Sequence, residues 1–287
     1  MGMQINTNIS ALNAHRNLSN TQNDLSKSLE KLSSGLRINR AADDAAGLSI
    51  SEGLRAQSNG LGVAARNAQD GISVIQTAEG ALTEVHSILQ RVRDLAVQAG
   101  SDSNNDDSRK ALTTEATALG DELARIADTT NFNGINLMDG AALSFQVGAN
   151  GDPSSQISVN LTDLADAVKT VTALVAGTDV AAGTSTLAID LTSATAAATS
   201  ITAIDTAITA ISSSRSELGA SQNRFESAIN SLNVSRENLS AAESRIRDVD
   251  MAGEMVKFTA KNILSQAGTA MLAQANQSTQ GVLSLLR

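Results

Sequence analysis

The chain has 287 residues with no Trp, Tyr or Cys and a single Pro, and it carries a formal net charge of −9. The negative charge argues against nonspecific nucleic-acid binding, and the missing cysteines exclude disulfides, thiolate metal sites and cysteine nucleophiles. Large aromatic side chains usually line ligand pockets, so their scarcity disfavours a pocketed enzyme, whereas the near absence of Pro permits long helices.

The N-terminus has no basic flank followed by an apolar stretch, so the sequence predicts no cleavable secretory signal. The sequence also contains no run of eighteen apolar residues, so it predicts neither a transmembrane helix nor insertion into a membrane. We therefore expect a protein that stays in the cytoplasm or leaves the cell by a route that does not cleave it.

Residues 5–36 are predicted to form an amphipathic helix. Its apolar stripe contains leucines seven residues apart, and a further leucine lies on the neighbouring stripe: Leu18, Leu25, Leu32 and Leu29. Alone, such a terminal helix is marginal in water, so its stripe must be buried against the other terminus or against neighbouring copies of the chain.

Residues 37–62 contain several glycines among charged side chains, a composition that predicts a hinge or spoke that is helical only in part. The charged residues of this segment are Arg37, Arg40, Asp43, Asp44, Glu52 and Arg55. We expect Asp43 and Asp44 to form a salt-linked structural joint with the neighbouring arginines, in which exposed pairs contribute little each. A contact between subunits is a subsidiary hypothesis for the same residues.

Two long helices are predicted next, over residues 61–98 and 108–127, with a polar loop between them. The apolar residues of each helix step by four and three, which keeps one seam apolar over many turns. The seam residues are Ala78, Leu82, Val85, Leu89, Val92, Ala96 and Ala99 in the first helix, and Leu112, Ala116, Leu119, Leu123 and Ile126 in the second.

The pattern changes from helical to extended after residue 130. Turn signals occur at residues 131–134 and 139–140, and residues 143–147 and 157–161 alternate between apolar and polar side chains. These features predict a β-hairpin. Residues 163–200 are rich in Ala, Thr, Val and Gly and show no clear period.

A helical pattern returns over residues 203–246, a joint is predicted at 247–250, and a terminal helix at 252–286. Leu218, Phe225, Leu232, Leu239 and Ile246 repeat every seven residues. The terminal helix presents Met271, Leu272, Val282 and Leu285 among its apolar residues. If identical copies bury such a stripe head to tail, a filament results, although a closed helical bundle would show a similar pattern.

Catalytic signatures are missing from the sequence. Its two histidines, His15 and His86, lie far apart, and it has no HExxH zinc motif, no GxSxG nucleophile elbow and no phosphate-binding GxxxxGK[ST] loop. We expect His86 to be a structural or solvent-facing residue. The sequence therefore predicts no enzyme activity, no catalytic residue, no metal and no cofactor.

Several long motifs resemble bacterial flagellin, the subunit of the flagellar filament, nearly from end to end. They are INTN at residues 5–8, LSSGLRINRAADDAAGL at 32–48, GALTE at 80–84, LQRVRDLAVQ at 89–98, NFNG at 131–134, QVGAN at 146–150, LGASQNRF at 218–225 and QANQ at 274–277. The poorest match covers about residues 163–201, where this family varies in length and sequence.

The resemblance implies a mainly α fold: a long antiparallel coiled-coil rod, terminal helices that pair the two ends of the chain, and a small β-hairpin region in the middle. Residues 1–45 and 251–287 would then form the inner tube domain with its spoke, and residues 46–250 the rod. It also implies secretion in unfolded form, extracellular assembly of identical subunits, and partners that include an export chaperone at the C-terminal helix, the filament cap and the hook-filament junction proteins.

The resemblance further implies recognition of the monomer by the innate immune toll-like receptor for flagellin. The matching residues are Gln90, Arg91, Leu95, Gln98 and Glu115. Arg91, Leu95 and Gln98 share one helix face, with Leu95 expected to be exposed. Three alternatives remain open: a hook-filament junction protein with similar terminal helices, a secreted enzyme on a helical scaffold, and a stand-alone coiled-coil adaptor.

Overall fold

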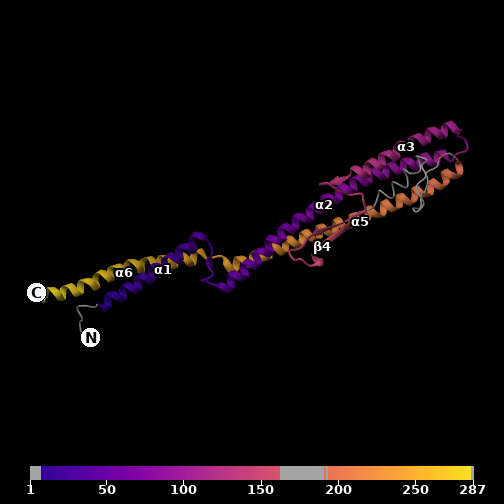
Figure 1. The fold of residues 1–287 in the computed structure, drawn as a ribbon. Coiled ribbons are helices and arrows are strands. Elements are labelled where there is room, and N and C mark those ends of the chain that lie inside the picture. Colours follow the sequence, from indigo (N-terminus) through magenta and orange to yellow (C-terminus); the bar gives the residue numbers. More distant parts are fainter. Residues whose placement is uncertain (1–7, 162–190, 192, 286–287) are drawn as a thin grey trace. The chain divides into compact units, whose positions relative to one another are not determined.

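A computed structural model describes residues 8–161, 191 and 193–285, with side chains through residue 277. The helices are α1 (Ile9–Ser34), α2 (Ala45–Ala99), α3 (Asp106–Thr129), α5 (Ala194–Arg247) and α6 (Met251–Leu285), with a short 3₁₀ turn, η1 (Pro153–Ser155). The strands are β1 (Asn131–Phe132), β2 (Ile135–Asn136), β3 (Ala142–Gln146) and β4 (Gln156–Asn160). Figure 1 shows these elements.

The chain divides into two compact units, one formed by residues 1–58 with 237–287 and the other by residues 59–236. In the first unit α1 and α6 pack side by side, so the predicted pairing of the two ends of the chain is confirmed (Figure 1). The predicted domain boundaries at residues 45 and 250 stay a prediction, and residues 163–190, which lacked a clear period, lie outside the described residues.

The core of the 59–236 unit lies between α2, α3 and α5, which run side by side (Figure 1). Every predicted seam residue of α2 from Ala78 to Ala99 is buried, and the same four-three spacing extends back through Ile75, Gly71 and Ala68 to Ala64. The seven-residue repeat of α5 likewise begins earlier than predicted, because Ala197, Ile204, Ile211, Leu218 and Phe225 are all buried. These repeats make the rod a coiled coil.

The two predicted strands form an antiparallel hairpin, β3–β4, in which Leu143 pairs with Val159 and Phe145 with Ile157. A second, smaller hairpin joins β1 to β2 through Asn133 and Gly134, which have φ values of 50° and 80°. Positive φ at both central residues is the requirement of a type I′ turn, which explains the Asn-Gly pair. The ring of Phe145 meets Phe225 edge to face at 5.5 Å, so the β3–β4 hairpin packs against α5.

Helix α2 begins at Ala45, sixteen residues before the predicted start at residue 61, so the predicted start is wrong; within the predicted spoke, residues 37–44 are not helical and residues 45–62 are. Glycine lowers helix propensity by about 1 kcal/mol relative to alanine, which is why its frequency here suggested a break. Instead, one of these glycines lets another segment approach the helix closely. A Cβ at Gly60 would lie 3.1 Å from Ala149, whereas one at Gly62 would lie at an ordinary contact distance of 3.7 Å from Arg236.

Helix α5 also contains an 18-residue window with a mean hydropathy of 1.3, long and apolar enough by composition to cross a membrane. This window is not an uninterrupted apolar run, because threonines and serines lie among its apolar residues, so the sequence did not predict it. A helix that supplies Ile204 and Ile211 to a core has the same composition, so the window is weak support for a membrane span.

Candidate functional site: the terminal helix pair and its joint

Helices α1 and α6 are antiparallel and meet along seams with a four-three spacing. As the α1 residue number falls from 28 to 18, the contacting α6 residue number rises from 254 to 268. The α1 seam, whose residues are at least half-buried, comprises Ala11, Ala14, Leu18, Thr21, Leu25, Ser28 and Leu32. The inner seam of α6 comprises Glu254, Phe258, Lys261, Ser265, Gly268, Leu272 and Ala275. This spacing is that of a two-stranded coiled coil, yet many of its members are polar.

Polar contacts cross this seam at three levels. Glu254 is only 6% exposed and accepts a 2.7 Å hydrogen bond from the Ser28 hydroxyl. About two turns further along α6, Lys261 donates to the Asp24 carboxylate at 2.7 Å. Near the N-terminus of α1, the Asn8 amide donates to the carbonyl oxygen of Ala275 at 2.9 Å.

The carboxylates of Glu254, in the seam, and of Asp24, beside it, are both stabilised in their charged form. The Ser28 hydrogen bond lowers the pKa of Glu254, against the effect of burial, with help from Lys257 and Lys31. The hydrogen bond and positive charge of Lys261 lower the pKa of Asp24. Burial of an unpaired carboxylate would be costly, so these partners explain how a coiled-coil seam accommodates acidic side chains.

Four large apolar side chains of α6 point away from α1. Val256, Ile263, Leu264 and Met271, which we call the outer stripe, are 71%, 60%, 55% and 65% exposed. At 100° per residue they lie within about 100° of one another around the helix, away from the inner seam. An apolar face of this kind marks an interaction site.

The predicted assembly residues differ in their burial. Leu18, Leu25, Leu32 and Leu272 lie half-buried in the seams, whereas Leu29 and Met271 are exposed. The side chains of Val282 and Leu285 lie outside the described residues. Their role in assembly stays a prediction.

The joint between α1 and α2 is held mainly by backbone groups. Arg37 donates from its guanidinium to the carbonyl of Ile246, at the C-terminal end of α5, where a cation is favoured. The backbone N–H of Arg37 donates to the carbonyl oxygen of Arg247, and Leu36 forms an isolated antiparallel bridge with Asp248. Arg247 and Asp248 both lie in the predicted joint at 247–250.

The expectation of salt links at Asp43 and Asp44 is wrong, because both carboxylates accept backbone N–H groups. Asp43 accepts from Asn39 and Arg40, and these hydrogen bonds lower its pKa. Asp44 accepts from Gly47 at 2.9 Å and so caps the first turn of α2.

The ion pairs of the joint involve other acids. Arg40 pairs with Glu30 at 2.9 Å, and Arg247 pairs with Glu52 at 2.6 Å. Sequence proximity had suggested the neighbouring aspartates as partners, but short acidic side chains next to a helix start favour capping of its free N–H groups.

The predicted receptor-recognition residues are divided by the structure. Arg91 of α2 and Glu115 of α3 form an exposed ion pair at 2.5 Å, and the side chains of Gln90 and Gln98 are also exposed. Leu95, expected at the surface, is 1% exposed and belongs to the core. Because Arg91 faces α3 and Arg93 pairs with Asp205 of α5, α2 is covered on two sides, and its buried face is wider than one stripe.

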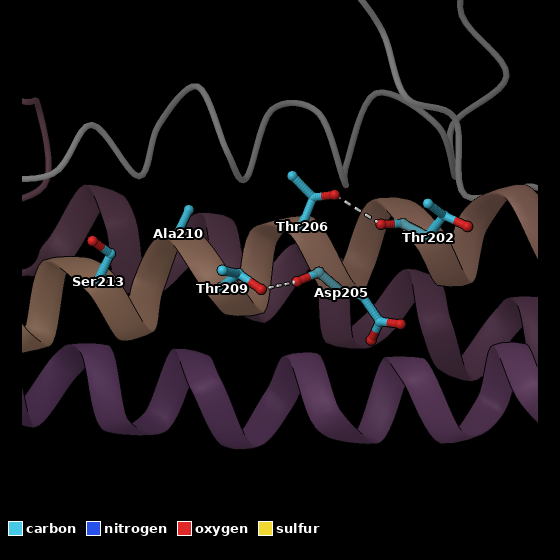
Figure 2. A pocket seen from close by; sticks show the side chains of 6 residues that line it. All are labelled: Thr202, Asp205, Thr206, Thr209, Ala210 and Ser213. Carbon is cyan, nitrogen blue, oxygen red and sulfur yellow. Dashed lines mark hydrogen bonds between the residues drawn. The ribbon is translucent and has the colours of Figure 1, made fainter.

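A shallow hollow on α5 offers no catalytic arrangement (Figure 2). Thr206 and Thr209 donate their hydroxyls to backbone carbonyls one turn earlier, and Asp205 is paired with Arg93. Among the described residues, no cluster of His, Cys, Asp or Glu could hold a metal ion. The predicted structural role of His86 is consistent with its hydrogen bond to Gln90 in α2.

Comparison with known proteins identifies the family. The model of the bacterial flagellin N-terminal helical region matches residues 5–142, and that of the C-terminal helical region matches residues 201–286. The chain is 53% identical to a flagellin of Halalkalibacterium halodurans, over 99% of this chain and all of that one. It is 52% identical to a flagellin of Bacillus subtilis, also over 99% of this chain and all of that one.

A solved structure titled as a flagellar hook-associated protein from Vibrio parahaemolyticus has a TM-score of 0.58. It covers 72% of this chain and all of that chain at 14% identity, so it shows a shared fold alone. The family models match most of the sequence, and the two flagellins match nearly all of it. The chain therefore belongs to the bacterial flagellin family.

Proposed function

We infer that the chain is a structural subunit of the bacterial flagellar filament, an extracellular polymer built from copies of flagellin. Identity above 50% to flagellins over nearly the whole chain supports this role. The hook-associated protein shares only the fold, so nothing favours a hook-filament junction protein. A structural role is also consistent with the helix pair, whose exposed groups suit packing between chains and not catalysis.

The observation that carries the finer proposal is the outer stripe of α6. This helix pairs with α1 through a partly polar seam and leaves Val256 and Ile263 exposed to solvent. In a polymer of identical chains, the stripe would be buried against neighbouring copies. Fully burying a Val or Ile side chain contributes about 1.5–3 kcal/mol. The outer stripe therefore supplies a driving force for assembly that the monomer does not use.

Replacing Val256 and Ile263 by Gln tests this proposal. Both side chains are exposed in the monomer, so we expect circular dichroism to remain unchanged. The critical concentration for seeded polymerisation should rise at least ten-fold, since each 1.4 kcal/mol lost corresponds to about a factor of ten. Val234→Gln is the matched control, because Val234 is 59% exposed on α5. Normal polymerisation by the double variant would contradict the assignment of the stripe.

Deleting residues 253–287 is a coarser test of the same proposal. Because the core of α2, α3 and α5 contains none of these residues, we expect a folded rod that stays in solution and forms no filaments. Filaments from the truncated chain, seen by negative-stain electron microscopy, would refute a requirement for α6.

The remaining partners are proposals supported by the family resemblance. An export chaperone would hold α6, and cap and hook-filament junction proteins would contact the two ends of the polymer. Innate immune toll-like receptor recognition would use the exposed Arg91–Glu115 pair with Gln90 and Gln98, while buried Leu95 would only support that surface. Arg91→Ala should reduce activation of receptor-expressing cells by monomer, whereas Arg125→Ala, at another exposed pair, should not.

A further inference from the structure

The apolar residues of α1 do not by themselves determine how it aligns with α6. Leu18, Leu25 and Leu32 are seven residues apart, so sliding one helix by seven residues places one leucine where another had been. The inner seam of α6 has Phe258, Ser265 and Leu272 at the same spacing, two apolar residues and one polar residue. A seven-residue slip therefore leaves the leucines of α1 at seam positions, so features other than the leucine repeat must select the observed alignment.

The charged residues of the pair do distinguish the alignments. In the observed one, Asp24 contacts Lys261 at 2.7 Å. Glu254 accepts a hydrogen bond from Ser28 and interacts electrostatically with the positive charge of Lys31. Each acidic group thus faces a hydroxyl or a cation of the other helix.

Either slip would bring like charges together. Moving each α1 residue seven positions further along α6 places Lys31 opposite Lys261, and Asp24 then faces Gly268. Moving it seven positions back places Asp24 opposite Glu254. Like charges at facing positions are destabilising, and a buried carboxylate such as Glu254 would also lose its hydroxyl partner.

We propose that the Asp24–Lys261 and Ser28–Glu254 contacts, with Lys31, are the determinants of register between the terminal helices. They select one alignment out of several that the leucine repeat permits. Polar residues at seam positions of coiled coils specify register in this way, at some expense of stability. The weakly apolar seam of α6 is explained by this requirement.

The absence of natural cysteines allows register to be measured with introduced disulfides. A Cβ at Gly268 lies 3.7 Å from the Cβ of Leu18, within the range of a disulfide. The pair Leu18→Cys and Gly268→Cys therefore reports the observed register. The pair Leu18→Cys and Ala275→Cys reports the slip, because in the observed register these positions are about 10 Å further apart along the helix axis.

The experiment combines each pair with Lys261→Glu in the full chain and scores intramolecular disulfides by peptide mass spectrometry. The new carboxylate faces Asp24 in the observed register and Lys31 after the slip. We expect the first disulfide to form about five-fold less and the second to increase. Adding Asp24→Lys should restore the first disulfide. Arg16→Glu, an equal charge change at an exposed α1 residue, should alter neither.

An unchanged ratio of the two disulfides in Lys261→Glu would overturn the proposal. So would an equal change in Arg16→Glu, which would indicate a general effect of charge. Loss of both disulfides without recovery by Asp24→Lys would also overturn it, because the residues would then stabilise the pair without selecting its register.

Discussion

Two glycines of the same helix are expected to respond in opposite directions to the same substitution. A Cβ at Gly71 of α2 would lie 2.9, 3.1 and 3.3 Å from three ring atoms of Phe225, whereas a Cβ at Gly80 would meet nothing within 4 Å. Phe225 is completely buried and its ring meets Phe145 edge to face, so it has little freedom to retreat. The comparison isolates close packing from helix propensity.

The magnitudes follow from these contacts. Gly80→Ala should stabilise the rod by about 1 kcal/mol, the difference in helix propensity between the two residues. Gly71→Ala gains the same term, but carbon atoms pack best at about 3.5–4.0 Å, and overpacking a rigid core costs about 1–3 kcal/mol. We expect a net loss of about 1–2 kcal/mol, and hence a difference of about 2–3 kcal/mol between the two variants.

Thermal unfolding followed by circular dichroism at 222 nm is the appropriate assay, because the chain has no Trp or Tyr for fluorescence. The two melting temperatures should differ by about 5–10 °C. Adding Phe225→Leu to Gly71→Ala should be less destabilising than the sum of the two single changes, since the smaller side chain relieves the contact. The reasoning is refuted if both alanine variants are stabilised to a similar extent.

Two further predictions concern the helix ends and the terminal pair. Asn105 caps α3 by accepting the N–H of Ser108 at 2.8 Å, so Asn105→Ala should destabilise the rod by about 1 kcal/mol, measured by urea unfolding. Acid should weaken the α1–α6 pair: Glu254, facing Ser28, Lys257 and Lys31, and Asp24, facing Lys261 and Lys27, have lowered pKa values in the folded state. The stability that these carboxylates contribute is therefore fully present above their unfolded-state pKa values and is lost as pH falls through their folded-state pKa values. The helix content of the α1–α6 pair should decrease below about pH 5. Glu254→Gln should make the helix content depend less on pH.

The helices of this chain could be predicted from the periodicity of their apolar residues. The ends of the helices were harder to predict, because glycines within a helix resemble helix breaks. The four-three spacing from Ala78 to Ala99 anticipated a buried seam residue by residue. The start of α2 was predicted too late because Gly60 and Gly62 suggested a break, whereas both lie within the helix and Gly60 accommodates the close approach of Ala149. Such close contacts come from distant parts of the sequence, so local propensity cannot reveal them.

The candidate site was predictable in location but not in chemistry. Apolar stripes indicated that the two ends of the chain pair, and they do. The polar contacts between Ser28 and Glu254, and between Asp24 and Lys261, were not predicted, because the periodic signal in α1 comes from its leucines. Polar residues recurring at seam positions of both helices were the available signal. Leu95 was misplaced for a related reason, since one helix face was considered without the two neighbours that cover it.

A heptad repeat predicts a seam without specifying what covers it, and α5 illustrates the difference. The positions of its seven-residue repeat are buried from Ala197 through Phe225, but Leu232, Leu239 and Ile246 in the same repeat are only half-buried. The sequence shows no change in pattern at that point. Fewer side chains of the same chain pack over the later positions of the repeat. A repeat in one helix does not specify which other segments cover it. In a protein that assembles from identical copies, half-covered positions of an unbroken repeat are where a neighbouring chain can complete the packing.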